Sequence, residues 1–171
     1  MGTHISNRDI YFQSFTFNDP AVVELLLTHR YKYDDNLFLD YGDVSGATGA
    51  YSVNTEVIVT YVELDNLVKA CNFSESELQI IKLLGLGYTV SEVAAMFNVQ
   101  QKNLNKKLKT LCKKVVNENL RKWRIWAYTE KLNLKTMKCS KCKNDLPATE
   151  EFFAPDYSKK TGFRGICKNC R

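Results

Sequence analysis

Two Cys-x-x-Cys pairs near the C-terminus are the residues of this chain whose type and spacing are best suited to metal chemistry. Cys139 and Cys142 form the first pair, and 24 residues separate it from the second pair, Cys167 and Cys170. In a reducing compartment, paired thiols at this spacing are more often zinc ligands than disulfides. Because four thiolates complete a tetrahedral site and leave no position for water, we expect one structural Zn²⁺.

The elements around these cysteines define a small C-terminal module, residues 136–171. A segment of this size cannot make a sufficient apolar core, so the metal is expected to supply the missing stability. The other two cysteines, Cys71 and Cys112, fall at apolar positions of expected helices. We interpret them as small buried hydrophobic residues.

Two capping boxes mark helix starts in the central part of the chain. Ser74 stands three residues before Glu77, and Thr89 stands three residues before Glu92. In this pattern each side chain takes a free backbone N–H group of the other residue. The first helix should run to about residue 84 and the second to about residue 97, with a tight turn at 98–99. The residues expected to face inward are Leu78, Ile81 and Leu84 in the first helix and Val93, Ala94 and Phe97 in the second.

A third helix is predicted by an apolar stripe of helical period, formed by Leu104, Leu108, Leu111 and Val115. This arrangement is typical of a helix-turn-helix, which has two capped helices, a short turn and a third helix with a narrow apolar seam. The chain is therefore expected to be mainly α, with a helix-turn-helix domain over 74–135, an irregular N-terminal region over 1–73 and the small zinc-binding module at the C-terminus.

The third helix and its continuation are strongly basic. Nine Lys or Arg and one acid, Glu118, lie between Lys102 and Arg124. In a helix-turn-helix, the first residues of this helix reach base edges in the major groove, and lysines bind phosphates. The residues expected to read bases are Gln100, Gln101, Lys102, Asn103 and Asn105, and those expected to bind phosphates are Lys102, Lys106, Lys107 and Lys109. The alternative is a solvated basic face on a helix that binds protein.

Trp123 and Trp126 follow in the same basic stretch. We expect Trp123 or Trp126 to cover the core. An alternative is that these aromatic rings stack on nucleic acid, as aromatic residues among cations can do.

The N-terminal region differs from the rest in charge. Residues 1–73 carry four Lys or Arg against ten Asp or Glu, whereas residues 74–171 carry twenty against nine. A basic part fits a polyanion, and an acidic part suits solubility, a basic protein partner or masking of the basic face. The sequence predicts a helix over about 20–30, opened by Asp19 and Pro20, then an irregular loop over 33–54 and an extended segment over 55–62.

The composition is that of a globular protein, and its apolar runs are too short to span a membrane. The first residues contain no apolar core with a cleavage site, so we expect no secretory signal and a cytoplasmic location.

Residues 74–116 resemble region four of bacterial sigma factors and the related output domains of response regulators. The residues that carry the resemblance are Glu77, Leu83, Gly87, Tyr88, Glu92, Val93, Ala94, Phe97 and Val99. The pattern departs in the third helix, where Gln100 to Asn103 replace the usual Ser-x-x-Thr/Ser. The resemblance implies a helix-turn-helix that binds double-stranded DNA and works with RNA polymerase.

Residues 138–171 resemble a small zinc element of phage and mobile-element proteins that often precedes an HNH nuclease core. Beside the cysteines, the matching residues are Pro147, Phe152 or Phe153, Gly162, Phe163 and Arg164. No histidine follows His29, so a His-Asn-His nuclease site is not expected. Lys159, Lys160 and Arg164 are candidates to touch phosphate or a protein partner instead.

These features predict a DNA-binding transcription regulator or sigma-like factor, encoded by a phage or a mobile element, and no enzymatic activity. RNA polymerase and a second copy of the chain are the expected protein partners. The alternatives are a DNA-packaging or recombination adaptor similar to a small terminase subunit, a protein that binds and modulates RNA polymerase, and a nuclease. The nuclease alternative rests on Asp34, Asp35, Asp40 and Asp43, which we interpret as ordinary loop acids.

Overall fold

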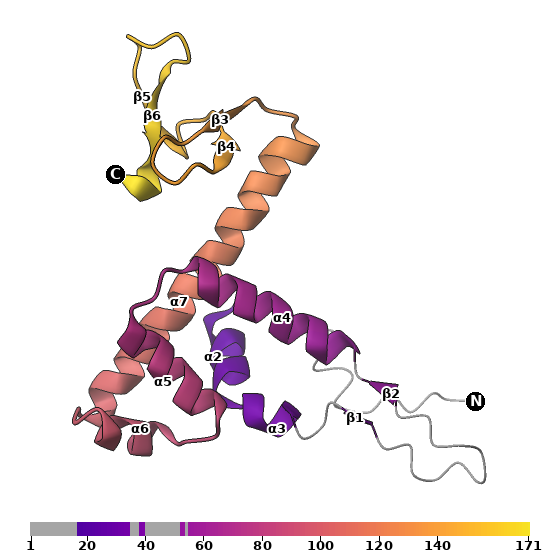
Figure 1. Ribbon diagram of the computed structural model, residues 1–171, viewed down its shortest axis with the longest axis vertical. Helices are drawn as coiled ribbons and strands as arrows, with labels where there is room; N and C mark the ends of the chain where they lie inside the picture. The colour runs from indigo at the N-terminus through magenta and orange to yellow at the C-terminus, as the bar shows by residue number, and fades with distance from the viewer. Residues whose placement is uncertain (1–16, 35–37, 40–51, 54) are drawn as a thin grey trace. The chain divides into compact units, whose positions relative to one another are not determined.

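The protein is mainly helical and divides into two compact units, residues 1–119 and 120–171 (Figure 1). The computed structural model describes residues 17–34, 38–39, 52–53 and 55–171. In that part of the chain, no helix has both the length and the apolar character needed to cross a membrane.

The first unit begins with two short helices, α2 (Pro20–Thr28) and α3 (Arg30–Asp34). As the sequence indicated, α2 begins at Pro20, and Oδ1 of Asp19 accepts a hydrogen bond from the Ala21 N–H at 2.8 Å. Val23, Leu26 and Leu27 of this helix are buried. Two short strands, β1 (Phe38–Leu39) and β2 (Ser52–Val53), pair antiparallel. Most of the loop expected over 33–54 lies outside the described residues, as do Asp35, Asp40 and Asp43.

The prediction of an extended segment over residues 55–62 is wrong, because these residues form the first half of helix α4 (Thr55–Ala70). Its β-branched residues favour a strand when judged locally. The buried residues, however, recur with a helical period. Burial of this face in the tertiary structure outweighs the local preference for a strand. They are Val57, Tyr61, Leu64 and Leu67, whereas Ile58, Val59 and Val62 are exposed.

A bidentate ion pair links α3 to α4. Nη1 and Nη2 of Arg30 donate to the two carboxylate oxygens of Asp65 at 2.6 and 3.0 Å. The guanidinium also lies 5.1 Å from the ring centroid of Tyr61. A planar guanidinium suits both partners at once, because it can donate two hydrogen bonds to a carboxylate and also stack on an aromatic face.

Helices α5 (Glu75–Gly85) and α6 (Val90–Met96) begin at the predicted capping boxes. Oε2 of Glu77 accepts from the Ser74 N–H at 2.8 Å, and Oε2 of Glu92 accepts from the Thr89 N–H at 2.7 Å. The inward face of α5 differs in part from the prediction, since Leu78 is exposed and Ile81 half-buried, whereas Ile80 and Leu84 are buried. In α6, Val93 and Ala94 are buried as expected, and Phe97, which follows the helix, is half-buried.

Helix α7 (Gln101–Trp126) is the longest element. The predicted stripe of Leu104, Leu108, Leu111 and Val115 is buried, and Cys112 and Val116 widen it. The turn before α7 depends on Asn98, whose φ of 51° lies in the left-handed region. This conformation lets the Val99 N–H reach the Ala94 carbonyl at 2.9 Å, which closes the end of α6.

We expect Asn98→Ala to lower the free energy of unfolding by about 1 kcal/mol, because an alanine Cβ is strained at positive φ. Asn98→Gly should stay within about 0.5 kcal/mol of the parent, because glycine accepts this conformation. Urea unfolding followed by circular dichroism would measure both variants. Equal losses for alanine and glycine would contradict the argument, since they would point to the side-chain amide and not to backbone strain.

The second unit contains the end of α7, a π-helical turn η1 (Ala127–Lys131) and two small hairpins. Strands β3 (Thr136–Lys138) and β4 (Asp145–Pro147) pair antiparallel, as do β5 (Phe153–Pro155) and β6 (Phe163–Cys167), and a short helix η2 (Lys168–Cys170) follows. Its core contains Leu146, Phe152 and Phe153. Ile125 and Tyr128 pack against this core, so the unit begins earlier than residue 136, the start predicted for the C-terminal module.

Candidate metal centre and basic helix face

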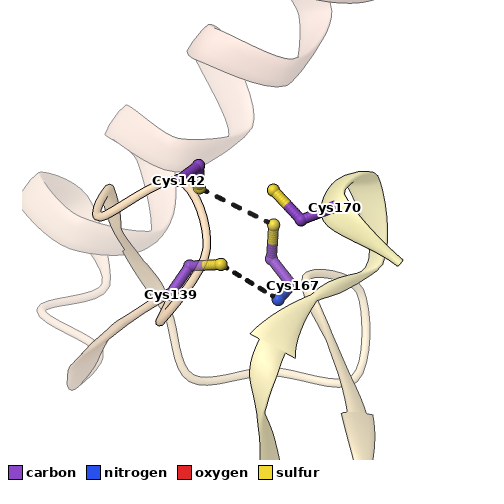
Figure 2. A group of neighbouring side chains, drawn as sticks. All are labelled: Cys139, Cys142, Cys167 and Cys170. Atoms are coloured by element: carbon purple, nitrogen blue, oxygen red, sulfur yellow. Dashed lines mark hydrogen bonds between the residues drawn. The ribbon is translucent and has the colours of Figure 1, made fainter.

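The four cysteines of the two pairs converge on one point. Cys139 and Cys142 lie in the turn between β3 and β4, and Cys167 and Cys170 lie at the end of β6 and in η2. Their four Sγ atoms all lie within 4.8 Å of one another (Figure 2). The Sγ atoms of Cys142 and Cys167 are 3.9 Å apart. Four thiol sulfurs at such distances could hold a metal ion, and soft thiolates favour soft or borderline cations.

Backbone hydrogen bonds hold the two turns together. The Cys139 N–H donates to the Asn144 carbonyl at 3.0 Å, and the Ser140 N–H donates to the Gly165 carbonyl on β6 at 2.8 Å. Lys143 closes the first turn with a φ of 62°. The positions of the four cysteines are therefore fixed by main-chain geometry that depends on both hairpins.

Hydrogen bonds and burial shift the pKa values of the clustered cysteines in opposite directions. The Cys167 N–H, which donates to Sγ of Cys139 at 3.3 Å, and the N–H groups of Cys142 and Lys141 lower the pKa of Cys139 to about 6. Burial raises the pKa of Cys167, and hydrogen bonds with the Cys167 and Cys142 thiols raise that of Cys170 to about 12. One thiolate is thus favoured, whereas further ionisation is opposed unless a positive ion joins the cluster.

The end of α7 supports the cluster through contacts that the sequence did not reveal. Nη1 of Arg124 and the Tyr128 hydroxyl both donate to the carboxylate of Glu151, the latter at 3.0 Å. The Arg124 hydrogen bond lowers the pKa of Glu151, and the hydrogen bond to Glu151 raises that of Tyr128. The Tyr128 ring also meets the Phe152 ring edge-on, with centroids 6.2 Å apart. These residues are distant from one another in the sequence, and each is of a type that is common on protein surfaces. No local sequence pattern therefore marks them.

The remaining two cysteines lie outside this cluster. Cys112 is buried in α7, and burial raises its pKa to about 12, so it stays a neutral thiol. The interpretation of Cys112 as a buried hydrophobic residue is confirmed. Cys71 is half-buried at the end of α4.

The residues predicted to contact DNA lie in the N-terminal part of α7, except Gln100, which directly precedes the helix. All are exposed except Lys107, which is half-buried. Five of them line a surface hollow of about 390 Å³, and these are Gln101, Lys102, Asn105, Lys106 and Lys109.

Helical spacing explains which predicted residues come together. Gln101, Asn105 and Lys109 are four residues apart, so they form one row along the helix, and Lys102 and Lys106 form the adjacent row. Gln100, Asn103 and Lys107 do not line the hollow. Lys113, one turn beyond Lys109, is exposed and extends the first row, although it was not among the predicted DNA contacts.

The two tryptophans are exposed, so the expectation that Trp123 or Trp126 covers the core is wrong. The reason is that Ile125 and Tyr128 take that role on the same stretch of chain. Lys159, Lys160 and Arg164 are also exposed, on the β5–β6 hairpin.

The described residues thus offer two candidate sites, a four-cysteine cluster in one unit and a polar, basic helix face in the other. Both were predicted from residue types and spacing, and the structure adds which side chains share a surface. Comparisons with known protein families, with characterised proteins and with solved structures found no match to the chain.

Proposed function

We propose that this chain is a sequence-specific DNA-binding protein that acts in transcription and reads the major groove with the N-terminal half of α7. The observation that carries the proposal is the two adjacent rows of exposed amides and lysines that line the hollow on that helix. Amide side chains make paired hydrogen bonds to adenine, and lysines neutralise phosphates. A face with these two groups interleaved suits duplex DNA better than it suits a protein surface.

The arrangement of the neighbouring helices supports this proposal. We interpret α5, α6 and α7 as a helix-turn-helix in which α7 is the recognition helix. The turn at Asn98 is short, and α7 has no acidic residue in its first turn. The positive end of the helix dipole therefore adds to the attraction for phosphate near Gln101 and Lys102.

The roles of the residues follow from their positions on α7. Gln101 and Asn105 are assigned to base edges, because they lie near the helix start on the same row. Lys102, Lys106 and Lys109 are assigned to phosphates, which a flexible ammonium group reaches without fixed geometry. Gln100, Asn103 and Lys107 remain secondary candidates, since they do not line the hollow.

The metal is proposed to be a single structural Zn²⁺. A Zn–S bond of about 2.3 Å sets the edges of a tetrahedral ZnS₄ site at about 3.8 Å. The 3.9 Å separation of the Cys142 and Cys167 sulfurs fits that geometry. With four protein ligands there is no open position for a substrate or water, so the ion supports folding and not catalysis.

The sigma-like and response-regulator-like pattern of residues 74–116 favours a transcription regulator or sigma-like factor with RNA polymerase as a partner. The likeness of residues 138–171 to phage and mobile-element zinc elements favours such an origin. A cytoplasmic location is part of the same proposal, because cysteine ligands for zinc persist in a reducing compartment.

Selection of binding sites from randomised duplex DNA tests the proposal, using the full chain loaded with zinc. We expect an enriched motif and an affinity that falls with salt, because phosphate contacts release counterions. Gln101→Ala should cost about 1–3 kcal/mol and relax preference at one base position. Lys106→Ala should weaken binding to all sequences and lower the salt slope by about one.

Lys69→Ala is the matched control, since Lys69 is an exposed lysine on α4 and lies away from the hollow. It should leave both the motif and the affinity unchanged. Duplex binding with no enriched motif would favour the packaging or recombination adaptor. No duplex binding at low salt would overturn the proposal and leave a protein partner for the basic face.

A further inference from the structure

Two exposed tryptophans lie side by side in the second unit. The exposed fractions of Trp123 and Trp126 are 57% and 43%, and their rings meet edge-on with centroids 5.2 Å apart. Tryptophan is usually well buried, because removing its large aromatic surface from water stabilises the folded protein. A pair of exposed tryptophan rings is therefore a typical mark of a binding surface.

The folding of the unit does not account for these two side chains. Ile125 and Tyr128, on the same stretch of helix, pack against the core around the cysteine cluster. Trp123 and Trp126 are three residues apart and so share a helix face, separate from the one that Ile125 and Tyr128 present to the core. Neither tryptophan belongs to that core, and both side chains remain exposed.

The pair lies in a stretch of chain that is rich in cations. Residues 121–135 contain five Lys or Arg and one acid, Glu130. Nζ of Lys131 lies 5.2 Å from the ring centroid of Trp126, and Lys122 is exposed one turn before Trp126. Arg124 is not assigned to this surface, because it is paired with Glu151. The charge and the flat apolar rings together suit a ligand that is anionic and also has aromatic faces.

We propose that Trp123 and Trp126, with Lys122 and Lys131, form a binding surface for single-stranded nucleic acid, at which unpaired bases stack on the indole rings and the lysines bind phosphates. Stacking of bases on aromatic side chains is the usual way in which proteins hold single strands. In a duplex the base faces are already stacked on one another, so this surface selects unpaired strands. The inference does not depend on duplex reading by α7, whose residues lie in the other unit.

Tryptophan fluorescence gives a direct test, because the chain contains two tryptophans and both belong to this surface. The full zinc-loaded chain is titrated with oligo(dT) of about 12 nucleotides, within the site sizes known for such surfaces. Saturable quenching of the fluorescence is expected. Oligo(U) of equal length and a blunt duplex are titrated in parallel. The first comparison shows whether the surface prefers ribose or deoxyribose, and the second whether it prefers single strands.

Variants are compared by the anisotropy of labelled oligo(dT), since they change the fluorophore itself. Trp123→Ala and Trp126→Ala should each weaken binding by about 5- to 150-fold, and Trp→Phe at either position should restore part of it. Lys131→Ala should weaken binding and reduce its salt dependence. Tyr157→Ala is the control, because Tyr157 is 91% exposed elsewhere in the same unit and should not matter.

Two outcomes would overturn the inference. One is the absence of quenching by either oligonucleotide at low salt. The other is a fluorescence change that depends on protein concentration alone, together with dimers in sedimentation that Trp126→Ala abolishes, which would assign the surface to a second copy of the chain. Lys106→Ala separates this inference from duplex reading, because it should weaken duplex binding and leave oligo(dT) quenching intact.

Discussion

Replacing Cys167 with serine is expected to release the metal ion and unfold residues 136–171. Cys167 provides one sulfur of the cluster, and its backbone N–H donates to Sγ of Cys139. Structural zinc sites contribute about 10–16 kcal/mol of apparent binding free energy at neutral pH. The few buried side chains of the two hairpins cannot replace that contribution.

Elemental analysis and limited proteolysis measure this result. The parent chain should contain one zinc per molecule and resist cleavage in the hairpins, whereas Cys167→Ser should contain little metal and be cut there. Acid should release the metal from the parent, because protons compete for the thiolates that bind it. Cys71→Ser is the control, since Cys71 lies outside the cluster and the variant should keep its zinc. A Cys167→Ser chain with full metal content and intact protection would refute the metal assignment.

Leu111→Ala is expected to lower the free energy of unfolding of the first unit by about 2–5 kcal/mol. Leu111 is completely buried in the middle of the stripe of α7, between Leu108 and Val115. Truncation removes apolar contacts and leaves a cavity that the surrounding helices fill only in part. Urea unfolding monitored by circular dichroism would show an earlier transition, and Leu111→Met should cost less than about 1.5 kcal/mol.

This variant also separates folding from recognition. Duplex binding should fall in Leu111→Ala only under conditions in which the helices unfold, whereas Lys106→Ala should bind weakly while its unfolding curve stays unchanged. A Leu111→Ala chain of unaltered stability would show that α7 is not anchored through its apolar stripe.

Several features were predictable because they depend on neighbours in the chain. A capping box joins residues three apart, so Ser74 with Glu77 and Thr89 with Glu92 were enough to place the starts of α5 and α6. The buried stripe of α7 follows from its helical period. Cys-x-x-Cys spacing brings two sulfurs together within one turn, and two such pairs predict one four-sulfur cluster.

Other features could not be predicted because they depend on burial against distant residues. The β-branched residues of α4 favoured an extended segment until Val57 and Tyr61 were seen to be buried with a helical period. On α5, the local pattern was compatible with more than one inward face. In the folded protein Ile80 is buried, whereas Leu78 is exposed. Ile125 and Tyr128 took the core positions expected of the tryptophans.

The sequence by itself determined the starts of α2, α5 and α6, the apolar stripe of α7, its basic character and the four-cysteine cluster. It could do so because each is fixed by hydrogen bonds, periodicity or charge within a few residues. Only the tertiary structure decided which of the predicted α7 residues share one hollow, and that Arg124 and Tyr128 meet Glu151. It also decided that Trp123 and Trp126 stay exposed, because burial of a side chain is set by the surfaces that fold against it.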